Sequence, residues 1–148
     1  MQNSKIKKKI ITLIGPTACN KTSTAIHLIR KFPISIIGVD SVQIYKRFNI
    51  GSAKPSQEIL KQYKHHLVDS IDPENIFSVK DFYDQTFKLV IQAHLENKIP
   101  LLVGGTMMYF NALFKGINDI PEGSEAIINE LQLSLIHISE PTILLSSS

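Results

Sequence analysis

The residues that most directly suggest chemistry lie near the amino terminus, where an apolar run gives way to a polar segment containing a lysine and a threonine. The segment reads Leu13-Ile14-Gly15-Pro16-Thr17-Ala18-Cys19-Asn20-Lys21-Thr22. It has the form G-x-x-x-x-G-K-[ST] of a phosphate-binding loop, with Asn20 at the position of the second glycine. In such a loop, backbone N–H groups and the start of the following helix point at one spot and hold a di- or triphosphate. We therefore expect all eight residues from Gly15 to Thr22 to form a diphosphate- or nucleotide-binding site.

Three residues of this loop have individual roles. Lys21 would place a full positive charge at the outer phosphates, and the Thr22 hydroxyl would bind Mg²⁺, the cofactor that we expect. The second glycine usually adopts a left-handed backbone conformation that costs an ordinary residue roughly 1–2 kcal/mol, and asparagine is one of the few residues that adopt it routinely. The alternative is an ordinary strand–turn–helix unit in which a polar residue only caps the helix.

The hydrophobic pattern predicts the strand and the helix that such a loop needs on either side. Continuous apolar runs predict buried strands at residues 9–14, 34–39 and 100–103, with a short one at 66–68. Helical spacing predicts helices at 21–31, 78–97 and 107–114, with a short one at 57–63. Ser78 and Asp81 mark the start of the longest helix, and Gly116 marks the end of the last. Because strands alternate with helices, we expect a three-layer α/β fold with a mostly parallel sheet and helices on both faces.

Polar or glycine-rich segments follow each of these predicted strands. They are residues 15–22, Asp40 with Ser41, Asp69, and Gly104-Gly105-Thr106. Because ligands of parallel sheets bind at the carboxyl ends of the strands, these segments should face one cleft. The cleft would combine a phosphate loop with one or two carboxylates and a hydroxyl.

Length, charge and cysteine content limit the class of protein. The chain has 148 residues, 43% of them hydrophobic, which suits one domain with a core. Its net charge of +3 is compatible with a nucleic-acid partner but does not require one. The single cysteine, Cys19, excludes an internal disulfide and fits a reducing compartment. No apolar run approaches the ~18 residues of a membrane span. We expect a cytoplasmic protein that is a monomer and does not bind membranes.

Five blocks of the sequence carry a more specific signal. They are Gly15-Pro16-Thr17-Ala18-Cys19-Asn20-Lys21-Thr22, Val39-Asp40-Ser41-Val42-Gln43-Ile44-Tyr45, Gly51-Ser52-Ala53-Lys54-Pro55, His65-His66-Leu67 and Gly104-Gly105-Thr106-Met107-Met108-Tyr109-Phe110. In their order and spacing they resemble the tRNA dimethylallyltransferase (tRNA isopentenyltransferase) family. The resemblance covers residues 1–132 and implies a P-loop NTPase-like catalytic core that is truncated. Residues 133–148 do not resemble the family, and we expect them to be artefactual or disordered.

The resemblance implies transfer of a dimethylallyl group from dimethylallyl diphosphate to N6 of the adenosine 3′ of the anticodon in a tRNA anticodon stem-loop. The phosphate loop, Lys21, and Mg²⁺ held by Thr22 would stabilise the negative charge that develops on the leaving diphosphate. Asp40 matches the family's general base, which draws a proton from the adenine amine. Thr106 matches a threonine beside the bridging oxygen of the diphosphate. The segment that meets tRNA matches Asp40, Ser41, Val42 and Gln43.

Simpler alternatives exist for several of these residues. Asp40 could bind Mg²⁺, as the carboxylate after a strand does in phosphate-loop NTPases, and Thr106 could only cap its helix. His65 and His66 should point in opposite directions on a strand and form no metal site. Met107 and Met108 should be packing residues of their helix.

The basic residues of the loop should either contact tRNA phosphates or remain solvated; they are Lys46, Arg47 and Lys54. Asp69 is assigned no role.

Two alternative functions remain open. A P-loop small-molecule kinase would use Lys21, Thr22 and Asp40 on ATP and Mg²⁺, and only the later blocks argue against it. The non-enzyme alternative is an inactive fragment, because the family's tRNA-gripping inserted domain has no counterpart in this chain. We expect the diphosphate site to form, but little or no transfer to tRNA by this chain alone.

Overall fold

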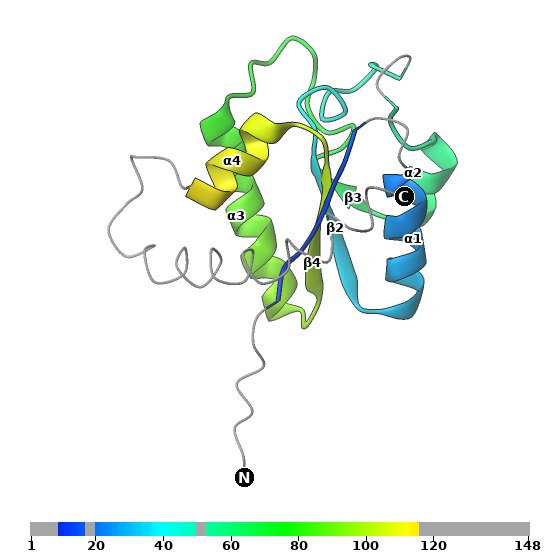
Figure 1. Cartoon of the computed structure of the whole chain (residues 1–148). Helices are drawn as coiled ribbons and strands as arrows, with labels where there is room; N and C mark the ends of the chain where they lie inside the picture. Colours follow the sequence, from blue (N-terminus) through cyan, green and yellow to red (C-terminus); the bar gives the residue numbers. More distant parts are fainter. Residues whose placement is uncertain (1–8, 17–19, 50–52, 116–148) are drawn as a thin grey trace.

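Four parallel strands form the centre of the molecule, in the spatial order β1-β4-β2-β3. The computed structural model describes residues 9–16, 20–49 and 53–115 (Figure 1). Within them the strands are β1 (Ile11–Ile14), β2 (Ile34–Val39), β3 (His65–His66) and β4 (Ile99–Gly104). The helices are α1 (Lys21–Lys31), α2 (Gln57–Gln62), α3 (Val79–Leu95) and α4 (Met107–Lys115). The parallel sheet predicted from the alternation of apolar runs is confirmed.

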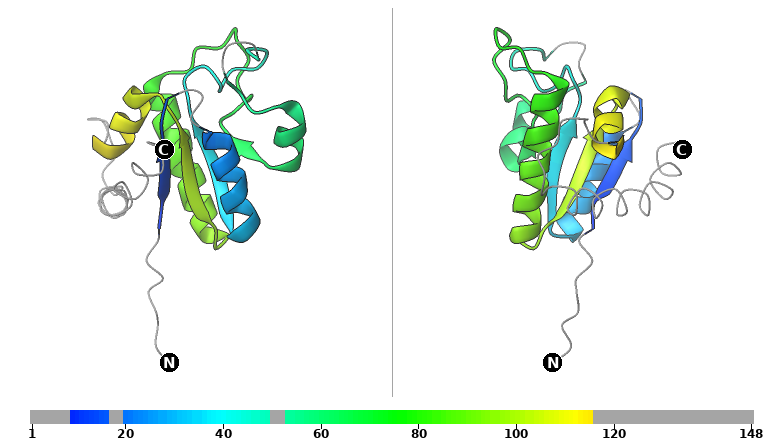
Figure 2. Two further views of the ribbon diagram at one scale, coloured as in Figure 1. Left: turned by 45° about the vertical axis from the view of Figure 1, so that its right-hand side comes forward. Right: turned by 90° about the vertical axis from the view of Figure 1, so that its left-hand side faces the viewer.

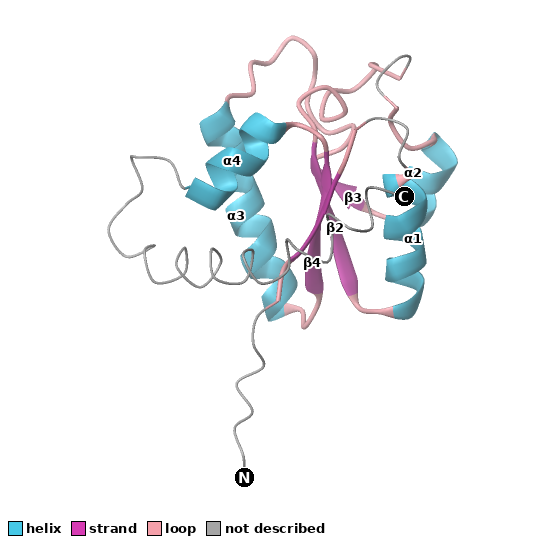
Figure 3. Cartoon of the chain, in the orientation of Figure 1, coloured by secondary structure: helices cyan, strands magenta, loops and turns pink. Residues whose placement is uncertain are grey.

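Helices cover both faces of the sheet, as the sequence predicts. Figures 2 and 3 show α1 and α2 on one side of the strands and α3 and α4 on the other. Neighbouring residues of one strand point to opposite faces, so Leu101 packs in the cluster under α1 while Leu102 packs in the cluster under α3 and α4. On the α3 and α4 side, the rings of Phe82 and Tyr109 stack with centroids 4.0 Å apart. Continuous apolar strands are therefore explained by burial on both faces.

The predicted ends of the elements are largely confirmed. Helix α1 spans the predicted residues, and α3 begins with a capping box in which Ser78 accepts a hydrogen bond from the Asp81 backbone and Asp81 accepts one from the Ser78 backbone. Strand β3 is a correction, because it occupies His65–His66 instead of residues 66–68. Leu67 and Asp69 have positive φ angles of 58° and 52°, which end the extended strand. Gly116, the predicted end of α4, lies outside the described residues.

The described residues contain no helix long and apolar enough to cross a membrane. They also contain no group of three or more histidine, cysteine, aspartate or glutamate side chains that could hold a metal ion. His65 instead uses its ring locally, with Nδ1 donating to the Tyr63 carbonyl oxygen at 2.8 Å.

The two histidines of β3 should make stability depend on pH. Burial lowers the pKa of His65, opposed only in part by its bond to Tyr63, and burial together with the charge of Lys64 lowers the pKa of His66. The unfolded chain then binds protons more readily than the folded protein. The two histidines therefore cost no stability above about pH 6.5, and the free energy of unfolding falls as the pH drops from there toward the folded-state pKa values. We expect His65→Gln to flatten this slope in urea unfolding at pH 5 to 7.5. His27→Gln, at an exposed position on α1, is the control, and an equal slope in both variants would contradict the assignment.

Candidate functional site

The residue before α1 has the backbone conformation that the predicted phosphate-binding loop requires at that position. Asn20 precedes the helix with φ 58° and ψ 29°, the left-handed conformation predicted for the position of the second glycine. The Lys21 Nζ donates hydrogen bonds to the carbonyl oxygens of Gly15 at 2.6 Å and Pro16 at 2.5 Å. The lysine charge is thus held over the loop that follows β1. Thr17, Ala18 and Cys19, the middle of the predicted loop, lie outside the described residues.

A cavity of about 570 Å³ opens at this helix start. It brings together residues from three of the four predicted segments at the carboxyl ends of the strands. Its lining is Asn20, Lys21, Thr22, Ser23, Ile26, His27, Arg30, Asp40, Gln43, Ala53, Ile59, Val103, Gly104 and Gly105. The volume lies within the ~300–1,000 Å³ of typical small-molecule sites. The lining beyond the phosphate loop, on α1 and α2, could not be predicted because it depends on how the two helices pack.

Asp40 follows β2 and is fixed by its own turn. Its Oδ1 accepts hydrogen bonds from the backbone N–H groups of Val42 at 2.8 Å and Gln43 at 3.0 Å. Aspartate commonly closes a turn of this kind. Within the part of the chain that the structure describes, Oδ2 has no hydrogen-bond partner, and Asp40 lines the cavity. The carboxylate is therefore oriented by one oxygen and presents the other for chemistry.

Thr106 joins the carboxyl ends of β2 and β4. Its hydroxyl accepts a hydrogen bond from the Ser41 backbone N–H at 3.0 Å and lies 3.4 Å from the Ser41 hydroxyl. Its backbone N–H donates to the Val39 carbonyl oxygen at 3.2 Å. The hydroxyl thus contacts Ser41, in the segment after β2. If Thr106 only capped its helix, its hydroxyl would instead accept a hydrogen bond from one of the first backbone N–H groups of α4. Gly105 lies so close to the loop that an added Cβ would be 2.9 Å from the Gly15 carbonyl oxygen.

The cavity also suits the predicted magnesium ion. Thr22 offers a hydroxyl and Asp40 a carboxylate, both on the cavity wall. Mg²⁺ prefers oxygen ligands and commonly takes only one or two protein groups, the rest being waters and substrate phosphates. The residues present therefore fit such an ion, and either side chain can contribute to it.

Comparison with known proteins agrees with this geometry. The family model described as IPP transferase matches residues 43–143. The chain belongs to the IPP transferase family. It is 45% identical over 126 residues to a tRNA dimethylallyltransferase of Dichelobacter nodosus, covering 85% of this chain and 40% of that protein. It is 52% identical over 113 residues to one of Psychrobacter, covering 76% of this chain and 31% of that protein.

Solved structures of the IPP transferase family share the fold. The tRNA isopentenylpyrophosphate transferase of Bacillus halodurans superposes with a TM-score of 0.70 at 35% identity, over 93% of this chain and 48% of that one. A eukaryotic dimethylallyltransferase described as acting on tRNA gives a TM-score of 0.70 at 30% identity, over 76% of this chain and 28% of that one. The P-loop NTPase-like fold predicted from the sequence is thereby confirmed. The chain spans less than half the length of the relatives named here.

The expectation for Lys54, in the loop before α2, is wrong. Lys54 neither contacts solvent nor is free to meet tRNA phosphates, because its side chain is 1% exposed and forms an ion pair with Asp69 at 3.0 Å. Asp69, to which the sequence assigns no role, does not line the cavity and accepts the hydrogen bond from Lys54. A lysine in a polar loop gives no periodic signal of burial, so the sequence could not reveal this pair. Lys46, by contrast, is 45% exposed and lies 3.6 Å from Asp72.

Proposed function

We propose that this chain forms the donor-binding and catalytic part of a tRNA dimethylallyltransferase. It would transfer the dimethylallyl group of dimethylallyl diphosphate to N6 of the adenosine 3′ of a tRNA anticodon and release diphosphate. The observation that carries the proposal is that Lys21, at the start of α1, and the Asp40 carboxylate line one cavity. The relatives named above are tRNA dimethylallyltransferases, which favours this function over the kinase.

The phosphate loop would hold the leaving group. As the bond from the allylic carbon to oxygen breaks, positive charge develops on the carbon and negative charge on the diphosphate. Lys21 and the backbone N–H groups at the start of α1 stabilise that negative charge. When bound, Mg²⁺ supplies further positive charge at the diphosphate through Thr22. Thr106 follows Gly105 of the cavity wall but does not itself line the cavity, so its hydroxyl would have to leave its 3.4 Å contact with Ser41 to donate to the bridging oxygen.

Asp40 would act on the acceptor. The adenine amine is a weak nucleophile until its proton is drawn away. As the bond from N6 to the allylic carbon forms, the proton leaves N6 for Oδ2 of Asp40, and the electron pair of the breaking bond departs with the diphosphate. Ser41, Val42 and Gln43 would contact the tRNA around an adenosine that is out of its stack. We further propose that the protein acts as a monomer. We also propose that it acts in the cytoplasm, because its tRNA substrate would be found there and its single cysteine fits a reducing compartment.

Calorimetric titration tests the donor site. The protein is titrated with dimethylallyl diphosphate and separately with ATP, both with Mg²⁺. We expect clear preference for the allylic diphosphate. Preference for ATP, with the isoprenoid ignored, would overturn the transferase proposal and support the kinase.

Lys21→Met should weaken donor binding by about 10–100-fold, the value of one charge-assisted hydrogen-bonding group. The Kd for dimethylallyl diphosphate is measured by the same titration. Lys31→Met removes an equal charge from the exposed far end of α1 and is the matched control. Equal weakening in both variants would show that only the general charge of the helix matters.

A further inference from the structure

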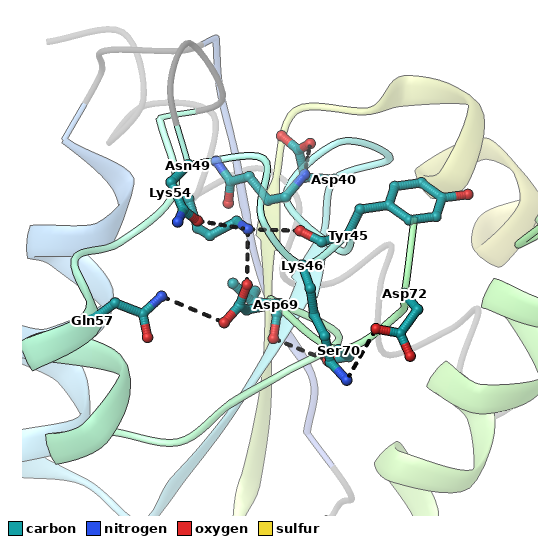
Figure 4. Close-up of polar contacts among 11 residues, drawn as sticks. Asp40, Tyr45, Lys46, Asn49, Lys54, Gln57, Asp69, Ser70 and Asp72 are labelled. Carbon is teal, nitrogen blue, oxygen red and sulfur yellow. Dashed lines mark hydrogen bonds and ion pairs between the residues drawn. The ribbon is translucent and has the colours of Figure 1, made fainter. Parts of the chain in front are cut away.

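An ion pair joins the Lys54 side chain, which is 1% exposed, to the Asp69 carboxylate, which is 27% exposed (Figure 4). The Lys54 ammonium donates to the Tyr45 carbonyl oxygen at 2.6 Å, to Asn49 Oδ1 at 3.2 Å and to Asp69 Oδ1 at 3.0 Å. An ammonium has three donors, so all of its capacity is used. With a side chain that is 1% exposed, Lys54 cannot also bind an outside ligand.

Asp69 is held as firmly on its own side. Its Oδ2 accepts a hydrogen bond from Gln57 at 3.4 Å, and its backbone has a φ angle of 52°. Burial opposes ionisation, but the hydrogen bonds from Lys54 and Gln57 and the charges of Lys54 and Lys46 outweigh it, so the pKa of Asp69 lies below its usual value. A left-handed backbone away from glycine persists where surrounding contacts impose it. Here the Asp69 side chain bonds to Lys54 and Gln57.

The pair reaches the catalytic turn through the backbone. The Asp69 N–H donates to the Gln43 carbonyl oxygen at 2.9 Å, and the next two N–H groups donate to the Ile44 carbonyl oxygen at 2.8 and 3.1 Å. The Gln43 N–H in turn donates to Asp40 Oδ1. A continuous path of hydrogen bonds therefore runs from Lys54 through Asp69 and Gln43 to the Asp40 carboxylate.

We propose that Lys54 and Asp69 are positioning residues that hold the turn at residues 40–43 against the sheet and so fix the direction of the Asp40 carboxylate. Neither residue lines the cavity, so they act through Gln43 and Asp40. That the direction of the Asp40 carboxylate matters for catalysis rests on the proposed function. The position of the turn itself is a property of the fold that can be measured without any substrate.

Amide hydrogen exchange of the whole chain, followed by NMR, tests the proposal. Lys54→Met should raise exchange at Val42, Gln43 and Asp69 by at least about 10-fold, whereas Leu101 and Leu102 in the central strand should keep their protection. Lys46→Met is the matched control, because it removes an equal charge from the same loop at an exposed pair. Equal exchange in both variants would overturn the proposal.

A second variant separates positioning from general stability. Lys54→Met leaves the 27% exposed carboxylate of Asp69 without its ion-pair partner and can lower the stability of the chain. The double variant Lys54→Met/Asp69→Asn removes both charges, and asparagine tolerates the left-handed backbone. We expect the double variant to recover most of the stability to urea but to keep fast exchange at Val42 and Gln43. If the double variant recovered both its stability to urea and slow exchange at Val42 and Gln43, the pair would contribute only to stability, and the proposal would be overturned. Titration with dimethylallyl diphosphate reports separately on the proposed function.

Discussion

Asp40→Asn is expected to slow dimethylallyl transfer by about 10²–10⁴-fold, the usual contribution of a general base. The asparagine Oδ1 can still accept the hydrogen bonds that the Val42 and Gln43 N–H groups give to Asp40. The turn therefore keeps its shape, and only the ability to take the proton from the adenine amine is lost. Because this chain alone is expected to transfer little or nothing to tRNA, the measurement is made in a complete transferase that contains this chain. It follows single-turnover transfer from labelled dimethylallyl diphosphate to tRNA with protein in excess.

Donor binding by the same variant decides between the two roles of Asp40. If the carboxylate is the base, the Kd for dimethylallyl diphosphate with Mg²⁺ stays unchanged while transfer is lost. If it binds Mg²⁺, donor binding weakens together with transfer, and the dependence on Mg²⁺ concentration shifts. Asp72→Asn is the control, because Asp72 is 55% exposed and pairs with Lys46 outside the cavity. Unchanged transfer in Asp40→Asn would exclude both roles.

The parts of the fold that could be predicted are those that local sequence decides. Asn20 could be predicted to adopt a left-handed conformation because few other residues tolerate it, and the capping of α3 by Ser78 and Asp81 depends on residues three apart. Strand β2 is flanked by Pro33 and Asp40, so its limits are set within the chain that forms it. In each case the physical cause lies within a few residues.

The parts that could not be predicted depend on contacts between distant segments. Strand β3 stops at His66 because the next residues turn to meet residues 43–46, a pairing that no local pattern encodes. The burial of Lys54 has the same origin, since its acceptors come from positions 45, 49 and 69. The catalytic candidates Asp40 and Thr106 could be identified because each follows a predicted strand and matches a motif of the family, whereas no motif or periodicity marks Lys54 or Asp69 as a positioning residue.

Gly104→Ala is expected to destabilise the protein strongly, because β4 packs closely against β2 at this residue. At Gly104 an added Cβ would lie 2.0 Å from the Val39 carbonyl oxygen and 2.4 Å from the Val39 carbonyl carbon. These are backbone atoms of the paired strand, so no side-chain rotation can relieve the clash. Overpacking of a core costs about 1–3 kcal/mol and occasionally more, and we expect Gly104→Ala to lose about 3 kcal/mol or more in urea unfolding.

Gly38→Ala is the matched control, because it makes the same change in the neighbouring strand. Its added Cβ would lie 2.6 Å from the side-chain atom Val68 Cγ2 and 3.2 Å from the Leu67 carbonyl oxygen. Its nearest backbone atom is thus much farther away than the 2.0 Å at Gly104, and the loss of stability should be smaller. An equal or smaller loss in Gly104→Ala would contradict the prediction, because it would show that the clash with the Val39 backbone is relieved as easily as the contact with Val68. Because Val39 precedes Asp40 and its carbonyl oxygen accepts the Thr106 N–H, separating these strands also moves the two catalytic candidates apart. We therefore expect Gly104→Ala to bind dimethylallyl diphosphate poorly even at temperatures at which the variant is still folded. Gly38→Ala should bind it normally under the same conditions.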